Sequence, residues 1–364
     1  MEAYPPAFPQ KGRGAVSNAT ARFERERREP IDDGWSRTGA EDEEDEPPRL
    51  KTTVTIDSSR TVIARNDSPD LGFDRSVNPY RGCEHGCIYC YARPSHAFLG
   101  LSPGLDFESR LLAKPAAPQL LAQELAKPGY TAEPLALGSN TDPYQPIERE
   151  MRITRGILEV LRDFNHPLTI TTKSALVLRD LDILAPMAEL GLAQVGISLT
   201  TLHPALARKM EPRAPRPRRR LEAIRALSLA GVPTAVMAAP MIPGLNDSEL
   251  ERILEAAAEA GASSASYVLL RLPLEIKDLF REWLEAHVPE RAKHVLSLVR
   301  ATRGGRLNDA NFGSRFRGEG PYAELMRTRF KLARKRLGLE RRNWRADCSR
   351  FRVPPRAGDQ LKLL

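Results

Sequence analysis

The chain has 364 residues, of which 41% are hydrophobic and 28% charged, and its formal net charge is +8. This length is enough to bury a large core, in one large domain or in two units of about 150 residues each. No stretch approaches the ~18 consecutive apolar residues of a membrane helix, and the N-terminus, Met1-Glu2-Ala3-Tyr4, lacks the basic and apolar regions of a secretory signal. With only four cysteines, we expect a protein of the reducing cytoplasm.

The first 50 residues differ in composition from the rest of the chain. They mix prolines, glycines and charges of both signs, and they end in the acidic run 41–46. Such a segment cannot bury enough apolar surface to offset the entropy lost on ordering. We therefore expect a disordered tail at 1–50, a core at 51–275 and a basic helical C-terminal extension at 276–364.

Three cysteines, Cys83, Cys87 and Cys90, lie within eight residues at the spacing C-x3-C-x2-C. A short glycine-containing loop of this kind can wrap around a cubane 4Fe–4S cluster, with one thiolate on each of three irons. The fourth iron keeps an open position, and open positions on metals are where substrates or cofactors bind. The spacing therefore predicts a 4Fe–4S cluster with a free site.

A structural zinc site is the main alternative, with His85 or His96 as the fourth ligand. Against it, Cys83 and His85 would crowd one metal, and no second C-x2-C pair is present. A disulfide framework is disfavoured because clustered cysteines pair badly and only Cys348 lies elsewhere.

Short apolar runs rich in β-branched residues alternate with longer segments of helical period. Strands are predicted at residues 73–77, 135–138, 168–172, 194–200, 234–240 and 265–272, and helices at 148–163, 180–190, 204–209, 218–230 and 248–260. Strands about 30 residues apart with helices between them indicate parallel βαβ units. We expect an α/β fold, a partial (β/α)6 TIM-like barrel, with the cysteine loop and the chemistry at the carboxyl ends of the strands.

The strand-end segments and the cysteine loop together resemble a known family. The chain is similar to the radical S-adenosylmethionine (radical SAM) superfamily, and within it to the spore photoproduct lyase and DNA repair photolyase-like branch. The resemblance spans about residues 75–275, with weaker likeness to about 335. Its motifs lie at residues 83–91, 138–148, 171–174, 196–200, 239–247, 269–273 and 312–320.

The resemblance implies two cofactors, a 4Fe–4S cluster and S-adenosylmethionine (AdoMet). It also implies an enzyme that reductively cleaves AdoMet to a 5′-deoxyadenosyl radical, which abstracts hydrogen from the substrate. The cofactor-binding residues that it implies are Tyr89 and Ile242 beside the adenine, Thr141 and Lys173 at the carboxylate, and Ser198 at the ribose.

One departure concerns the cysteine that returns hydrogen to the product radical in spore photoproduct lyase. No cysteine lies between Cys90 and Cys348 here, so Tyr91 or Tyr144 is expected as a catalytic donor, with the distant Cys348 as a further option. Three other residues have open roles. Asp142 and Glu148 serve either as acid–base groups or as helix caps, and Arg271 serves either as a phosphate ligand or as a structural ion pair.

Basic residues gather in two segments, 208–220 with seven cations and 326–339 with a cationic helix. The prolines at 212, 215 and 217 predict an extended first segment with outward-facing arginines, and together the segments suit a nucleic-acid backbone. A solvated surface is the alternative. Three functions follow: a radical enzyme on nucleic acid, one on a peptide or small metabolite, or a non-catalytic metal-stabilised nucleic-acid-binding protein. An electron donor such as flavodoxin or ferredoxin is expected as a partner of the first two.

Overall fold

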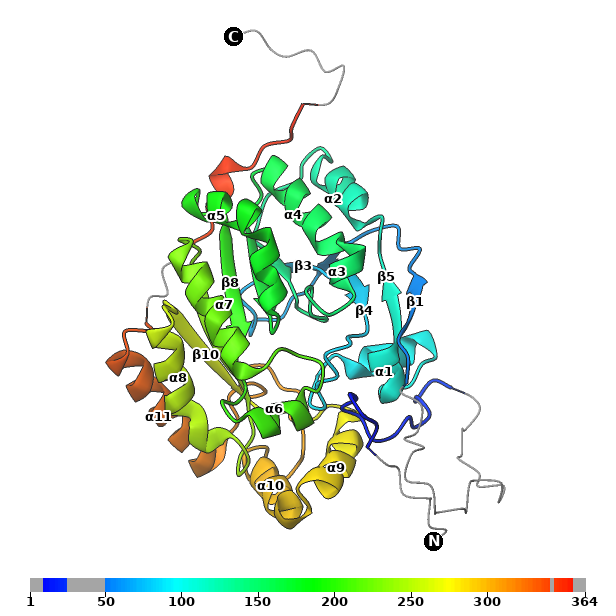
Figure 1. Cartoon of the computed structure of the whole chain (residues 1–364), viewed down its shortest axis with the longest axis vertical. Helices are drawn as coiled ribbons and strands as arrows, with labels where there is room; N and C mark the ends of the chain where they lie inside the picture. Colours follow the sequence, from blue (N-terminus) through cyan, green and yellow to red (C-terminus); the bar gives the residue numbers. More distant parts are fainter. Residues whose placement is uncertain (1–8, 25–49, 341–343, 356–364) are drawn as a thin grey trace.

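A seven-stranded sheet forms the centre of the protein. The computed structural model describes residues 9–24, 50–340 and 344–355. Its main sheet has the order β10-β9-β8-β7-β6-β3-β2, and β3, β8 and β10 of this sheet are labelled in Figure 1. Six of these strands are parallel neighbours and β2 is an antiparallel edge. The strands are β2 (Ile63–Arg65), β3 (Arg75–Val77), β6 (Leu135–Leu137), β7 (Leu168–Thr172), β8 (Ala193–Ser198), β9 (Thr234–Met241) and β10 (Ser264–Leu269).

Helices follow most strands and lie along the outer side of the curved sheet (Figure 1). They bury apolar residues at helical spacing, as α4 does with Ile153, Ile157, Leu158 and Leu161. The helices between strands are α2 (Ala117–Leu125), α3 (Glu148–Met151), α4 (Ile153–Asp163), α5 (Leu181–Glu189), α6 (Pro204–Met210), α7 (Pro217–Leu229) and α8 (Leu250–Glu259). Short 3-10 turns span Arg93–Leu99, Ala175–Asp180, Asp247–Glu249 and Cys348–Arg350.

The predicted α/β fold with six parallel strands is confirmed. The sheet order has two ends, β10 and β2, and closure between them is not seen in the described residues, which is consistent with the predicted partial barrel. All six predicted strands are present, and β7 has the predicted bounds.

The predicted helix at 148–163 is divided into α3 and α4. Arg152 separates them with a left-handed backbone, φ 51°. The Glu148 carboxylate accepts hydrogen bonds from Thr154 N at 3.1 Å and Arg155 N at 3.4 Å. It therefore supplies acceptors to the free amides at the start of α4, which is the capping role that the sequence left open.

A smaller sheet, β1 (Thr53–Ile56), β5 (Arg110–Ala113) and β4 (Tyr80–Arg81), lies beside the cysteine loop together with α1 (Leu105–Ser109). Residues 9–24 pack on this unit, with Arg13, Ala15 and Val16 buried. This differs from the predicted tail, because polar groups of α1 bind the segment. The other residues of that prediction, 1–8 and 25–49, lie outside the described part.

The C-terminal region is helical, as expected, with α9 (Ile276–His287), α10 (Pro289–Ala301) and α11 (Gly320–Arg336). The inner face of α11 packs against the core, and the rings of Phe330 and Tyr267 of β10 lie 4.6 Å apart. Among the described residues, no helix is both long and apolar enough to span a membrane.

The first basic segment corrects a prediction. It is not extended throughout, because α6 ends at Met210 and α7 begins at Pro217. Arg220 lies within α7 and is 1% exposed. Its guanidinium donates to Ser198 O at 3.1 Å and to Pro215 O at 2.8 Å, so it is a structural residue rather than an outward-facing cation.

The left-handed residue between α3 and α4 generates a test. A side chain in this conformation costs about 1–2 kcal/mol relative to glycine, partly offset by glycine's larger loss of entropy on folding. We expect Arg152→Gly to leave the free energy of unfolding unchanged or to raise it by up to ~1 kcal/mol. The matched control Arg225→Gly, exposed inside α7, should lower it by about 1 kcal/mol. Urea denaturation measures both, and equal losses would contradict the strain at Arg152.

Candidate active site

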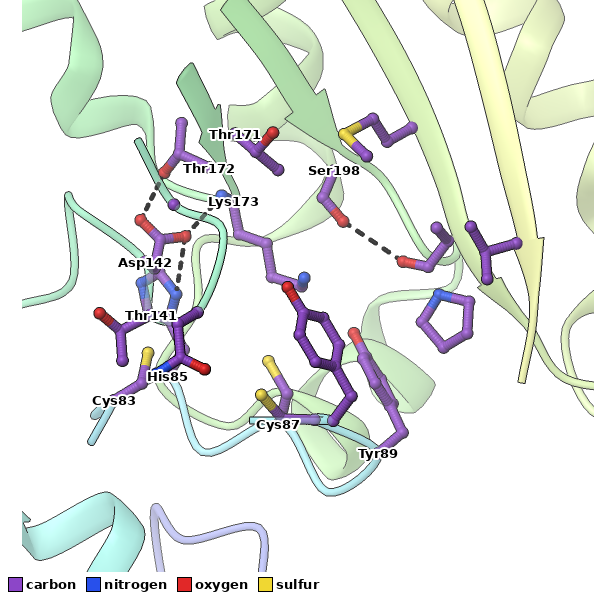
Figure 2. Close-up of a pocket in the computed structure, with 18 of the residues that line it drawn as sticks. Cys83, His85, Cys87, Tyr89, Thr141, Asp142, Thr171, Thr172, Lys173 and Ser198 are labelled. Carbon is purple, nitrogen blue, oxygen red and sulfur yellow. Dashed lines mark hydrogen bonds and ion pairs between the residues drawn. The ribbon is translucent and has the colours of Figure 1, made fainter. Parts of the chain in front are cut away.

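A pocket lies at the carboxyl ends of the parallel strands, beside the cysteine loop (Figure 2). Five strand ends contribute to it, so the predicted convergence of strand ends and cysteine loop is present. Its lining comprises Cys83, His85, Cys87, Tyr89, Cys90, Tyr91, Gly138, Asn140, Thr141, Asp142, Thr171, Thr172, Lys173, Ser198, Met237, Ala239, Pro240, Val268, Leu269, Leu270, Arg271 and Phe316.

The three cysteines line this pocket as free thiols. Cys83 and Cys87 are 7% and 8% exposed, and burial raises the pKa of the Cys87 thiol to about 12. In the described part of the chain, no three Cys, His, Asp or Glu side chains gather around one ion position. A cubane takes each thiolate at a separate iron, so this donor set fits a cluster better than a single zinc ion.

Glycines let the cysteine loop pass close to α1 and β5. Gly82 has φ +79°, and a Cβ there would lie 2.7 Å from Leu111 and 2.9 Å from Phe107 O. Gly86 has φ +65°, and its Cβ would lie 2.7 Å from the Glu108 carboxylate. Only glycine meets both demands, left-handed backbone and close approach.

The residues that the sequence offered as a fourth zinc ligand have other partners. His85 Nδ1 lies 3.2 Å from Asp142 Oδ2, and His96 Nε2 lies 2.9 Å from Arg110 O. The Asp142 carboxylate also accepts from Thr172 Oγ1 at 2.6 Å and from Lys173 N at 2.8 Å (Figure 2). Burial alone would raise the pKa of Asp142, but His85 and these hydrogen bonds lower it to about 2. This carboxylate joins the cysteine loop to the ends of β6 and β7.

Lys173 and Tyr89 face each other across the pocket, with the ammonium 5.7 Å from the ring centroid. Behind them lies Glu211, which the sequence analysis missed. Its buried carboxylate accepts from the Tyr89 hydroxyl, from Thr200 Oγ1 at 2.7 Å and from the Arg220 guanidinium. Burial alone would raise the pKa of Glu211, but the charges of Arg220 and Lys173 lower it to about 2.

Thr141 and Ser198 line the pocket as expected, although each hydroxyl already donates to the backbone. Thr141 Oγ1 donates to Tyr80 O at 3.0 Å, and Ser198 Oγ donates to Ala239 O at 3.3 Å. Their lone pairs can still accept a hydrogen bond from a ligand.

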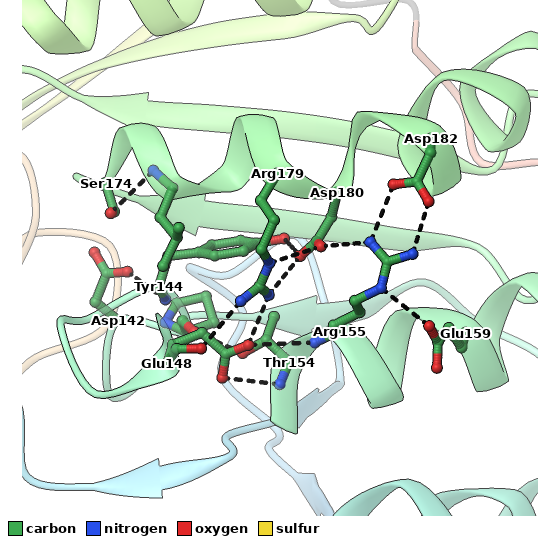
Figure 3. A network of polar contacts seen from close by, with 12 residues as sticks. Asp142, Tyr144, Glu148, Thr154, Arg155, Glu159, Ser174, Arg179, Asp180 and Asp182 are labelled. Carbon is green, nitrogen blue, oxygen red and sulfur yellow. Dashed lines mark hydrogen bonds and ion pairs between the residues drawn. The ribbon is translucent and has the colours of Figure 1, made fainter. Parts of the chain in front are cut away.

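Of the two expected hydrogen donors, only Tyr91 reaches the pocket. Tyr91 is 54% exposed and its hydroxyl donates to Ser139 O. Tyr144 is buried among ion-paired side chains (Figure 3). Its hydroxyl lies 3.1 Å from Asp180 Oδ2, and the Arg179 guanidinium lies over its ring. The interpretation of Tyr144 as a hydrogen donor is therefore replaced by a structural one.

Ile242 also lies away from the pocket. It is fully buried in a second apolar cluster with residues of α9 and α10, because Ile242 N donates to Asn246 Oδ1 at 2.6 Å and closes a turn. Pro240 and Met237 line the pocket in its place.

Arg271 is a cationic residue of the pocket. Its Nε is buried, and the guanidinium has neither a hydrogen bond nor an ion pair in the described part of the chain. The guanidinium stacks over the Phe316 ring at 5.4 Å. Burial and the nearby Arg315 lower its pKa, so an anion at this point would relieve an unfavourable environment.

Comparison with solved structures supports the fold. Structures of spore photoproduct lyase mutants resemble the chain with TM-scores of 0.54. One, at 16% identity, covers 78% of this chain and 79% of that chain. Another, at 15% identity, covers 78% of each and carries bound AdoMet and dinucleoside spore photoproduct. At these identities the likeness concerns the fold.

Sequence comparison identifies relatives and the family. An uncharacterised protein of Mycobacterium tuberculosis is 38% identical over 232 residues, which are 63% of this chain and 68% of that protein. One of Methanocaldococcus jannaschii is 29% identical over 214 residues, 59% of this chain and 76% of that protein. The model of the radical SAM superfamily matches residues 77–257, and this family uses a 4Fe–4S cluster and AdoMet, in agreement with the donor set of the pocket. The chain belongs to the radical SAM superfamily.

Proposed function

We propose that this radical SAM enzyme abstracts hydrogen from an anionic substrate, with nucleic acid as the candidate class. The observation that carries the proposal is the joint placement of three free thiols, Lys173 and Arg271 around one pocket, with no ion pair at Arg271 among the described residues. Lys173 is suited to bind the cofactor, and Arg271 remains to bind the substrate.

Cys83, Cys87 and Cys90 would hold the cluster, and Lys173 with Thr141 and Ser198 would hold AdoMet. When bound, these cofactors supply one-electron cleavage of the sulfonium and hydrogen abstraction from an unactivated carbon. Lys173 offers a compact ammonium for the AdoMet carboxylate, and Tyr89 offers a ring face for the adenine. One side of the pocket is apolar and would limit the access of water to the reacting atoms. It is formed by Met237, Val268, Leu269 and Leu270.

The substrate side of the pocket combines charge with flat aromatic surface. The Arg271 guanidinium can donate to a phosphate or carboxylate in a bidentate contact, and the half-exposed Tyr91 offers a ring face on which a base can stack. We assign Tyr91 as the donor that returns hydrogen to the product radical, since its hydroxyl is at the pocket and that of Tyr144 is not.

A peptide or small metabolite is the second candidate, because Arg271 would bind a carboxylate as well as a phosphate. The third function, a non-catalytic nucleic-acid-binding protein, gives no reason for a cofactor pocket. The basic segments 208–220 and 326–339 line no part of the pocket, so nucleic acid would have to reach Arg271 from the pocket mouth.

Lys173 provides the first test of this assignment. A hydrogen bond to a charged group is worth about 1.5–3 kcal/mol, so Lys173→Ala should weaken AdoMet binding roughly ten- to a hundredfold. Equilibrium dialysis of anaerobic cluster-loaded protein measures the affinity. Lys331→Ala, an exposed lysine of α11, is the control. Wild-type affinity in the Lys173 variant, with its cluster intact, would place the carboxylate elsewhere.

Arg271 provides the test of the substrate class. Arg271→Ala should weaken binding of the preferred anion, and for nucleic acid it should reduce the log–log salt slope by about 0.7–0.9. Fluorescence anisotropy with single-stranded DNA, duplex DNA, RNA and an acidic peptide separates the classes, with Arg252→Ala, exposed on α8, as the control. An Arg271 variant that binds all four probes as the wild type does would refute the anion site.

A further inference from the structure

The first basic segment lies behind the cysteine loop rather than at the pocket. It carries exposed cations on α6, on the following loop and on the first turn of α7. These are Arg208, Lys209, Arg213, Arg216, Arg218 and Arg219. The acidic residue among positions 204–219, Glu211, is buried and paired with Arg220. The exposed cations therefore form a positive surface, which we call the α6–α7 basic surface.

Direct contacts join this surface to the cysteine loop. Ile88 N, between Cys87 and Cys90, donates to Met210 O at 3.0 Å, and Arg213 N donates to His85 O at 3.3 Å. The Arg213 guanidinium lies 2.9 Å from the carboxylate of Glu84. The backbone that carries the cations is thus in hydrogen-bond contact with the loop that would hold the cluster.

Most of the surface charge is not neutralised within the protein. Arg218 and Arg219 share one half-buried partner, Glu222, at 3.0 and 2.9 Å, and such surface pairs contribute little to stability. Arg208 and Arg216 form no ion pair in the part of the chain that the structure describes. The surface therefore remains attractive to an acidic partner.

We propose that the α6–α7 basic surface docks an acidic, low-potential electron-carrier protein that reduces the cluster. The proposal rests on the cluster assigned to Cys83, Cys87 and Cys90 under the proposed function. In the transfer, the reduced carrier loses one electron and the cluster gains one, and no covalent bond forms or breaks.

The position of the surface favours this partner over nucleic acid. A substrate must enter the pocket, whereas an electron passes through protein and needs only a short path to the irons. None of residues 204–220 lines the pocket, yet their backbone touches the cysteine loop. Opposite charge would steer the carrier to this face and speed encounter at low salt.

The test compares two reductants on anaerobic cluster-loaded protein. The variant Arg208→Glu/Arg218→Glu/Arg219→Glu reverses three exposed charges and spares Arg213 and Arg220, which have structural partners. Glutamates at positions 218 and 219 would also lie at the positive end of α7, which limits the cost to folding. The control, Arg149→Glu/Arg162→Glu/Arg252→Glu, makes the same change in net charge at exposed sites on other helices. Thermal unfolding checks that both variants are folded.

Stopped-flow absorbance follows cluster bleaching by photoreduced flavodoxin and, separately, by dithionite. We expect the first variant to accept electrons from flavodoxin on the order of tenfold more slowly at low salt, with the difference shrinking at high salt. Dithionite should reduce both variants as it does the wild type, and calorimetry should show weaker binding of oxidised flavodoxin only to the first.

Each other outcome overturns a defined claim. If flavodoxin reduced the first variant as fast as the wild type, the docking surface would be refuted. If that variant also lost binding to single-stranded DNA, the α6–α7 basic surface would be reassigned to nucleic acid. An equal loss in the control variant would reduce the effect to net charge. Absence of bound iron and sulfide from the anaerobically reconstituted wild-type protein would refute the cluster itself, and with it the proposed function.

Discussion

The buried ion pair between Arg93 and Glu108 fixes the path of the cysteine loop. Both side chains are fully buried, and a buried pair is tolerated only when its remaining donors and acceptors are also satisfied. Arg93 donates to Gly86 O at 3.1 Å and Cys87 O at 2.9 Å, as well as to two carbonyls ahead of α1. The Glu108 carboxylate also accepts from Gly14 N at 2.9 Å and Ala15 N at 2.8 Å. These hydrogen bonds therefore join the cysteine loop, α1 and the N-terminal segment in one network. The positions of the three thiols depend on this network.

On its other side, the loop is held by carboxylates that belong to the α/β core. Asp142 joins it to the ends of β6 and β7 through His85, and Glu211 joins it to α7 through Tyr89 and Arg220. The same contacts that place the thiols at the pocket also place the α6–α7 basic surface behind them. In the proposed function, this arrangement separates a substrate side, with Arg271, from the surface that we propose for electron delivery.

The features predicted from the sequence are those with local signals. The cysteine spacing, each strand or helix, and Lys173 at a strand end can each be recognised from a short stretch of sequence. The structure has the cysteines and Lys173 at the pocket and the strands and helices in the predicted order. The errors concern long-range partners. Tyr144 binds Asp180, 36 positions away, and the 9–24 segment is ordered by Glu108, more than 90 positions away. Arg220 resembled a surface cation because its partner, Glu211, is identifiable as buried only from the packed fold. The left-handed backbone of Arg152 gave no signal in the sequence, because arginine is not a residue type that favours this conformation.

The central claim is that the pocket holds a 4Fe–4S cluster whose open iron faces AdoMet. Electron paramagnetic resonance of the anaerobic, dithionite-reduced protein tests it most directly, because a ligand on that iron alters the signal of the reduced cluster. We expect a cluster signal that changes when AdoMet is added and that is lost when Cys83, Cys87 or Cys90 is replaced by Ala, while Cys348→Ala retains it. A protein that contains one tightly bound zinc and no iron, or a cluster signal indifferent to AdoMet, would contradict the account.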